Sequence, residues 1–328
     1  MNITLNQEPA EVGGSEPTLR ALLSEKEIPR EAIVVAVNGD VIRREEWDSH
    51  RVKEGDEVEI VHAVAGGGGE EDLVIAGERF SSRLFLGTGK YEDPETMRAA
   101  LDRSGTEMVT VAVRYMDLSG DRSILRDLDL SRYRLLPNTA GATTAEGAIK
   151  MARLAREATG TEWLKLEVIG DKQTLWPDTA ATVEATRVLV EEGFVVLPYT
   201  SPDLMAAIRL EEAGAATVMP LASPIGSGQG MPDWTSIHRI VERISVPVVV
   251  DAGIGVPSDA ALAMELGAGA VLVNTAIARA DDPVAMAEAM KLGVRAGRLA
   301  RLAGRMPVSQ VAVPSSPTRG VPVGSGTS

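Results

Sequence analysis

The chain has 328 residues, of which 44% are hydrophobic and 24% charged, the composition of a soluble globular protein with room for two domains. It has no cysteine, which excludes disulfides, thiolate metal ligands and a cysteine nucleophile, and its net charge of −14 argues against nucleic-acid binding. No apolar run is long enough to span a membrane and the first residues form no basic, apolar leader, so we expect a cytoplasmic protein.

The negative charge is concentrated at the start of the chain. Residues 1–72 hold 7 Lys and Arg against 17 Asp and Glu, a balance of −10, which leaves −4 for the remaining 256 residues. A small acidic module of this kind can be steered toward a partner enzyme with a basic face. Solubility alone explains the charge equally well.

The first segment, residues 1–67, predicts a small β-grasp fold of the ubiquitin type. The expected elements are a strand at 3–6, a helix at about 18–26, a strand at 33–37 and a last strand at 58–64. Three leucines fall on one face of the helix, and Asn38-Gly39 supplies the positive-φ pair of a tight hairpin turn.

The last of these strands runs into four consecutive glycines, residues 66–69. A bare glycine arm can thread into a narrow enzyme pocket because glycine has no Cβ and tolerates nearly any backbone angle. Gly66 and Gly67 therefore match the arm of a carrier protein that is loaded on a terminal carboxylate, yet here they lie inside the chain. Residues 68–72, glycines followed by three acids, form the expected linker.

After the linker, apolar strands alternate with helical stretches, and residues 73–310 predict a TIM barrel, a (β/α)8 fold. The strand cores are expected at 84–86, 109–111, 135–136, 164–169, 195–197, 217–219, 248–250 and 271–273. The helices include 94–101, 144–158 and 182–192. Eight such units fit a barrel better than an open Rossmann sheet, which usually has six strands. Residues 311–328 are expected to be a flexible tail or a mobile lid.

The fourth strand carries a lysine and a glutamate two residues apart. Because side chains alternate along a strand, Lys165 and Glu167 share one face, and the apolar residues between and around them share the other. In a barrel the apolar set faces the helices, so the two charged side chains point inward. Burial is expected to lower the pKa of Lys165 and free its amine as a nucleophile toward a carbonyl. A purely structural Lys–Glu pair is the alternative.

The loops after strands six, seven and eight predict a phosphate site. Asp251 ends the seventh strand and is followed by Gly253 and Gly255, whose backbone N–H groups precede a helix. Similar turns occur at Asn274-Thr275 and around Gly226, and loops after strands seven and eight are the usual phosphate site of this barrel. Each loop alone is weak evidence, since glycines also serve simple turns, but the three together favour a phosphorylated small molecule.

Other patterns are rejected as sites. The stretch 87–90 lacks the spacing of a P-loop, so nucleotide binding is not expected there. The three histidines have no metal-ligand spacing, no Ser–His–Asp arrangement is supported, and we expect neither a metal nor a cofactor.

Residues 73–305 resemble bacterial thiazole synthase of thiamin biosynthesis, through "FLGTGKY", "LLPNTAG", "WLKLEVIGD", "GFVVLPY", "PIGSGQG", "VVVDAGIG", "AVLVNTAIA" and "MKLGVRAGRLA". Residues 1–67 resemble the ubiquitin-like sulfur carrier of the same pathway, through "VAVNGDVI" and "GDEVEIVHAVAGG". The joint occurrence of the barrel motifs is highly specific. The carrier match has fewer motifs and is reinforced by its position beside the synthase.

The resemblance implies a sulfur-transferring transferase. Lys165 would form a Schiff base with 1-deoxy-D-xylulose 5-phosphate, and Glu167 and Asp251 would move protons as the imine rearranges. The carrier's thiocarboxylate would deliver sulfur, and condensation with dehydroglycine would close the thiazole ring. The positions that match the family's sugar-phosphate site are Gly226, Ala252, Gly253, Asn274 and Thr275. The implied partners are an adenylyltransferase that activates the carrier, an enzyme that makes dehydroglycine, and three further copies in a homotetramer.

The chain departs from the family pattern in two short stretches and in the fusion itself. Arg114-Tyr115 stands where members commonly carry two arginines, which can weaken phosphate affinity or a subunit contact. Ala142 replaces a common cysteine, a neutral change between small residues. The fusion leaves Gly67 without a free carboxylate. Three outcomes are open. A protease releases the carrier, which is the interpretation we favour. Otherwise a separate carrier serves the barrel, or the arm reaches the barrel mouth unused.

Two other functions remain open at this point. An aldolase-like lyase would keep the barrel and the Schiff base and would work without any carrier. A non-catalytic carrier and scaffold would bind a sugar phosphate without turnover, but it would have no need to hold a buried amine beside two acids.

Overall fold

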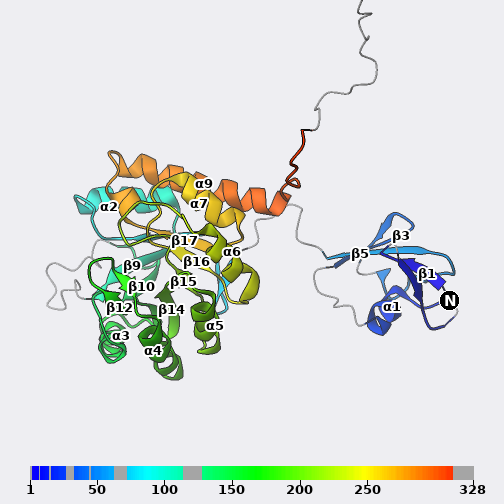
Figure 1. Ribbon diagram of the computed structural model, residues 1–328, viewed down its shortest axis with the longest axis horizontal. Helices are drawn as coiled ribbons and strands as arrows, with labels where there is room; N and C mark the ends of the chain where they lie inside the picture. Colours follow the sequence, from blue (N-terminus) through cyan, green and yellow to red (C-terminus); the bar gives the residue numbers. More distant parts are fainter. Residues whose placement is uncertain are drawn as a thin grey trace, which may run out of the picture.

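The computed structural model describes residues 2–6, 8–14, 16–26, 33–43, 46–62, 72–113 and 128–312 (Figure 1). The Gly66-Gly67 arm, the linker up to residue 71, Tyr115 and the tail beyond residue 312 lie outside these ranges.

The first module is a five-stranded sheet with one helix packed on it, the β-grasp fold expected from the sequence. The elements are β1 (Asn2–Leu5), β2 (Glu8–Glu11), α1 (Leu19–Glu25), β3 (Ile33–Val37), β4 (Asp40–Ile42) and β5 (Glu57–His62), with sheet order β2-β1-β5-β3-β4. Strand β5 pairs parallel with β1 and antiparallel with β3. The hydroxyl of Thr18 caps α1 by accepting from the Ala21 N–H, and Leu19, Leu22 and Leu23 are fully buried beneath the helix.

The second module is an eight-stranded parallel barrel, which confirms the predicted TIM barrel. Its strands are β8 (Leu84–Gly87), β9 (Met108–Ala112), β10 (Arg134–Asn138), β11 (Trp163–Leu166), β14 (Val195–Thr200), β15 (Met219–Pro220), β16 (Val249–Asp251) and β17 (Ala270–Val273). They follow the order β15-β14-β11-β10-β9-β8-β17-β16. Parallel bridges from Val218 to Val248 and from Leu221 to Asp251 join the two edge strands and close the barrel.

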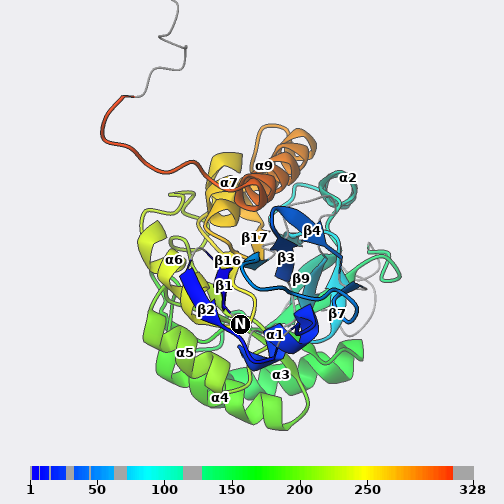
Figure 2. The same cartoon turned by 90° about the vertical axis from the view of Figure 1, so that its right-hand side faces the viewer.

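Helices surround the strands (Figure 2). They are α2 (Pro94–Ser104), α3 (Ala145–Thr159), α4 (Thr179–Glu191), α5 (Leu204–Glu212), α6 (Trp234–Arg243), α7 (Pro257–Glu265), α8 (Thr275–Ala278) and α9 (Pro283–Ala303). An aspartate side chain caps the first turn of α2, α4, α5, α6 and α9, which fixes where each of these helices begins. No helix in the described ranges is both long enough and apolar enough to cross a membrane.

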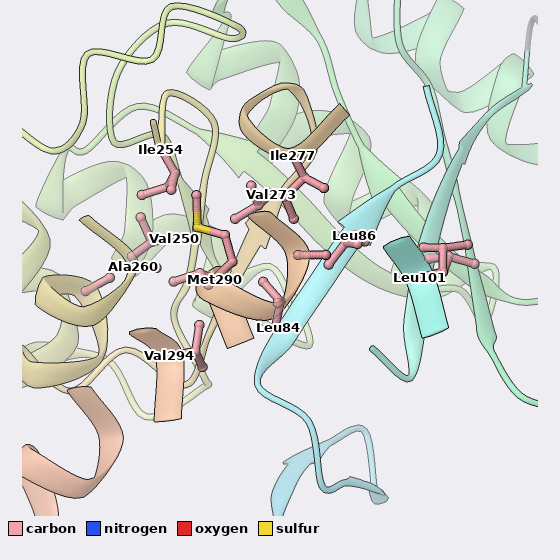
Figure 3. Close-up of a cluster of buried hydrophobic side chains, with 14 of the residues drawn as sticks. Leu84, Leu86, Leu101, Val250, Ile254, Ala260, Val273, Ile277, Met290 and Val294 are labelled. Carbon is pink, nitrogen blue, oxygen red and sulfur yellow. The ribbon is translucent and has the colours of Figure 1, made fainter. Parts of the chain in front are cut away.

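The main core lies between the strands and this helix layer. Figure 3 shows Leu84, Val250 and Val273 of the strands packed against Ala260 of α7 and Met290 of α9. The side chains alternate as expected on β11 too, where Leu164 and Leu166 pack with alanines of α3 and α4. The side chains on the inward faces of the strands therefore form a second hydrophobic cluster and the candidate active site.

A hairpin that the sequence did not predict closes one end of the barrel. It is formed by β6 (Leu73–Ile75) and β7 (Glu78–Phe80), and its apolar side chains join a cluster at the starting ends of the strands. Phe80 packs edge-on against Phe85, with ring centroids 6.0 Å apart, and against Trp163, at 5.8 Å. The strands therefore run from this hairpin toward an open mouth at the opposite end.

The expected fourth strand is shorter than predicted, and a second hairpin follows it. Strand β11 ends at Leu166, and β12 (Ile169–Asp171) pairs antiparallel with β13 (Trp176–Pro177) beyond it. The backbone of Glu167 pairs with the hydroxyl of Thr139 rather than with the backbone of a neighbouring strand. The hydroxyl accepts from the Glu167 N–H and donates to the Glu167 carbonyl oxygen, both at 2.8 Å. This exchange ends the strand while holding Glu167 at the mouth.

Candidate active site

The mouth of the barrel brings one lysine between two carboxylates. The Nζ of Lys165 lies 2.6 Å from Oδ2 of Asp251 and 3.3 Å from Oε1 of Glu167. Lys165 is 6% exposed, Glu167 5% and Asp251 2%, so the three charges are almost completely removed from water. The residues come from β11, the turn after it and the end of β16, and the structure brings together the group that the sequence nominated.

The predicted net shift of the Lys165 pKa is wrong in direction. Burial does lower the pKa of an amine, but the charges of Asp251 and Glu167 and their hydrogen bonds outweigh it, and the pKa of Lys165 is raised above its ordinary value. The resting group is therefore an ammonium ion held by two acids. To become a nucleophile it must give its proton to a neighbouring base, and the two carboxylates are in position to accept it.

Tyr199 is part of the site, and the sequence reasoning missed it. Its fully buried ring lies beside Lys165, with Nζ 5.7 Å from the ring centroid, near the outer limit for a cation–π contact. The phenol donates to the carbonyl oxygen of Leu175 in the β12–β13 hairpin, at 3.3 Å. Burial and the nearby charges of Asp251 and Glu167 raise the pKa of Tyr199, so the phenol stays neutral and can donate. The sequence signal was its place near the end of a strand, on the inward face.

The glycine loops line a cavity of about 940 Å³ that opens above this lysine. Its wall includes each residue nominated for the sugar phosphate, namely Gly226, Ala252, Gly253, Asn274 and Thr275, together with Lys165, Glu167 and Asp251. Ala252 has φ +58°, an uncommon conformation for a residue with a Cβ, and Gly253 follows at φ +70°. Two successive residues in this conformation turn the backbone sharply at the end of β16.

Close packing explains why glycine is needed at position 253. A Cβ there would lie 1.9 Å from the hydroxyl oxygen of Ser223 and 2.6 Å from its carbonyl oxygen. The Ser223 hydroxyl in turn donates to the carbonyl of Gly230 at 2.8 Å. The loops after β15 and β16 are thus locked together, which gives the cavity a preformed wall.

Asn274 links this wall to the loop after β8. With its amide nitrogen turned toward that loop, it donates to the carbonyls of Gly89 at 2.8 Å and Gly87 at 3.3 Å. A Cβ on Gly87 would lie 2.6 Å from the Asn274 side chain, so the two segments approach as closely as a glycine allows. The stretch 87–90 therefore supports the cavity wall by holding Asn274, and Lys90 lines the cavity itself. The sequence did not predict this role for residues 87–90, because their spacing was tested only against that of a nucleotide-binding loop.

Three further cations line the cavity, and the sequence did not nominate them as site residues. They are Lys90, Lys172 and Arg279, all of them exposed. Together with Lys165 they give the cavity four positive side chains against two carboxylates. A chain with a net charge of −14 thus presents a positive pocket, which favours an anionic ligand.

Comparison with known proteins identifies both modules. The family model described as thiazole biosynthesis protein ThiG matches residues 74–317, and that of the ThiS family matches residues 3–67. A protein named thiazole synthase from Paramagnetospirillum magneticum is 46% identical over 324 residues, which is 98% of this chain and all of the relative. That relative spans both modules, so their order in one chain is shared.

Two more relatives cover the barrel. A protein named thiazole synthase from Myxococcus xanthus is 56% identical over 254 residues, 77% of this chain and 97% of the relative. A chain of the crystal structure of the Amycolatopsis orientalis BexX/CysO complex is 39% identical, with a TM-score of 0.67, and the match covers 74% of this chain and all of that chain.

Proposed function

The chain belongs to the ThiG family of thiazole biosynthesis proteins and carries a ThiS-family domain ahead of its barrel, and from this membership we propose that it works through a Schiff base on Lys165. As a thiazole synthase with a fused sulfur-carrier domain, it acts in the biosynthesis of the thiamine thiazole. The observation that carries the mechanism is the buried Lys165, held at 2.6 Å from one carboxylate and 3.3 Å from another.

The proposed carbon substrate is 1-deoxy-D-xylulose 5-phosphate, a ketone with a phosphate at the other end. A carboxylate first takes a proton from the Lys165 ammonium, and the free amine then attacks the ketone carbon. The C–N bond forms, the carbonyl oxygen gains two protons and leaves as water, and a protonated imine results. The positive charge thus returns to the Lys165 nitrogen, where Asp251 and Glu167 already balance it.

The two carboxylates then serve as proton carriers for the rearrangement of the imine. Their side chains approach Lys165 from β16 and from the turn after β11, so they can act on different atoms of a bound sugar. Burial keeps bulk water from competing for these protons. We assign both as general acid–base residues, with Asp251 the nearer partner of the lysine in the resting site.

The phosphate is assigned to the glycine-lined wall. Backbone N–H groups at Gly226, Gly253 and the start of α8 can point at an anion, and a phosphate at this face is typical of the barrel architecture. The side chain of Asn274 is already used to hold Gly87 and Gly89. We therefore expect Asn274 to contribute its backbone rather than its amide.

Sulfur and the remaining atoms come from partners. The proposed donor is a carrier thiocarboxylate formed on the diglycine end of a ThiS-type domain by an adenylyltransferase, and dehydroglycine from a separate enzyme supplies the rest of the ring. A cavity of about 940 Å³ is large enough for a sugar phosphate and the tip of a glycine arm together. The homotetramer and the cytoplasmic location stay predictions.

Product formation with purified components tests the proposal. Full-length chain, 1-deoxy-D-xylulose 5-phosphate, dehydroglycine and separately prepared carrier thiocarboxylate should yield the thiazole phosphate, and Lys165→Ala should abolish it while still binding the sugar phosphate. Lys172→Ala is the matched control, because it removes a lysine of the same cavity that is exposed rather than buried. Turnover by Lys165→Ala would contradict the Schiff base, and cleavage of the sugar phosphate when the carrier thiocarboxylate and dehydroglycine are omitted would favour an aldolase-like lyase.

A further inference from the structure

The chain enters the barrel at the end opposite Lys165. Asp72, Leu73 and Val74 line a second, smaller cavity together with Ser245 and Gly269, which precede β16 and β17. Leu73, Ile75 and Phe80 are buried in the cluster at the starting ends of the strands. The active site is formed at the other ends of the same strands, by Asp251 and by the loop after β17.

The strands give the separation of the two ends. From Gly269, beside Leu73, to Asn274 at the mouth the chain advances five residues, or about 17 Å at about 3.3 Å per residue. The direct route through the barrel is filled by side chains such as Phe85, Met108 and Leu136, all fully buried. A segment that starts at Asp72 can reach the mouth only around the outside of the helix layer.

The covalent chain is too short for that route. Only four residues lie between Gly67 and Asp72, and the five Cα-to-Cα steps that join them span at most about 18 Å when fully extended. Passing outward over helices that are about 10 Å thick, along the strands and inward again needs roughly 37 Å or more. Peeling β6 and β7 off the barrel would supply the missing length, but it would expose Leu73, Ile75 and Phe80 to water.

We infer that the carrier domain of a chain cannot present Gly67 to the Lys165 of its own barrel, and that sulfur reaches each barrel in trans. The donor is a carrier from another molecule, released from its own barrel or made separately. This inference rests on the proposed function in taking the diglycine arm as the sulfur donor. It removes the possibility that the fused arm occupies its own active site.

Cross-linking measures the reach directly, because the chain has no native cysteine. In full-length protein, Gly67→Cys is paired with Lys172→Cys at the mouth or, as the matched control, with Ser245→Cys beside Asp72. Oxidation at high dilution should give an intrachain disulfide with Ser245→Cys and none with Lys172→Cys. An intrachain 67–172 disulfide would overturn the inference, and failure of the 67–245 pair would overturn the placement of the arm.

Complementation tests the delivery itself. In a bacterial strain that lacks its own thiazole synthase and carrier, full-length Lys165→Ala retains the carrier, and full-length Gly67→Val retains the barrel but has a blocked arm. We expect growth without added thiazole from the pair and from neither variant alone. If the unchanged chain supports growth and the pair of variants does not, delivery in trans is contradicted. Cross-linking needs no turnover, so it decides the reach even if the proposed function fails.

Discussion

Replacement of Gly253 by alanine tests how tightly the proposed phosphate wall is built. Two penalties are expected. The backbone has φ +70°, and this left-handed conformation costs a residue with a Cβ about 1–2 kcal/mol. The new Cβ would also lie 1.9, 2.6 and 2.7 Å from Ser223 atoms, two of which belong to the backbone, so the loops must shift. Overpacking of this kind costs about 1–3 kcal/mol.

Gly160→Ala is the matched control for Gly253→Ala. Gly160 ends α3 with φ +69°, and a Cβ there would meet nothing within 4 Å. It should therefore lose only the conformational part, about 1–2 kcal/mol of unfolding free energy, against roughly 2–5 kcal/mol for Gly253→Ala. Urea unfolding followed by far-UV circular dichroism measures both losses.

Calorimetry with the sugar phosphate supplies the second readout for this pair. We expect Gly253→Ala to lose affinity, because the displaced loops carry the backbone N–H groups assigned to the phosphate, and Gly160→Ala to bind like the unchanged chain. Equal losses of stability in the two variants would refute the steric argument. Unchanged affinity in Gly253→Ala would refute the assignment of the phosphate to this wall.

Three further predictions concern the lysine and its surroundings. Asp251→Asn should lower the pH midpoint for trapping an imine on Lys165, because Asp251 raises the pKa of the lysine. Glu167→Gln should lower the midpoint less, because Glu167 lies farther from the lysine than Asp251 does, and an upward shift in either variant would contradict this. Tyr199→Phe should raise KM more than it lowers kcat, because it keeps the ring and loses the hydrogen bond to the hairpin; unchanged steady-state kinetics would deny the hairpin tether any role. Phe80→Ala should cost about 3–5 kcal/mol of unfolding free energy in urea denaturation, and a loss below 1 kcal/mol would show that the hairpin is not part of the core.

The sequence predicted features that depend on short-range periodicity. The eight apolar strand cores were evident because each is a compact apolar run between helical stretches. Alternation on one strand was enough to turn Lys165 and Glu167 inward together. The parallel arrangement then placed Asp251 and the glycine loops at the same mouth, since the carboxyl ends of parallel strands meet there.

Features that depend on long-range contacts were missed. The β6–β7 hairpin is short, and its role follows from Phe80 meeting Trp163, which is far away in the sequence. Strand β2 was missed because Pro9 and its polar neighbours suit only a sheet edge. The direction of the pKa shift at Lys165 could not be predicted because it depends on two carboxylates at 2.6 and 3.3 Å, and burial alone gives the opposite sign.

The central claim is that Lys165 forms an imine with a ketose phosphate. Intact-mass spectrometry of the full-length chain after incubation with 1-deoxy-D-xylulose 5-phosphate and borohydride tests it most directly, with peptide mapping to locate the adduct. The account predicts one sugar-phosphate adduct per chain, on Lys165, and none in Lys165→Ala. An unmodified chain, or an adduct on the exposed Lys90 or Lys172, would contradict it.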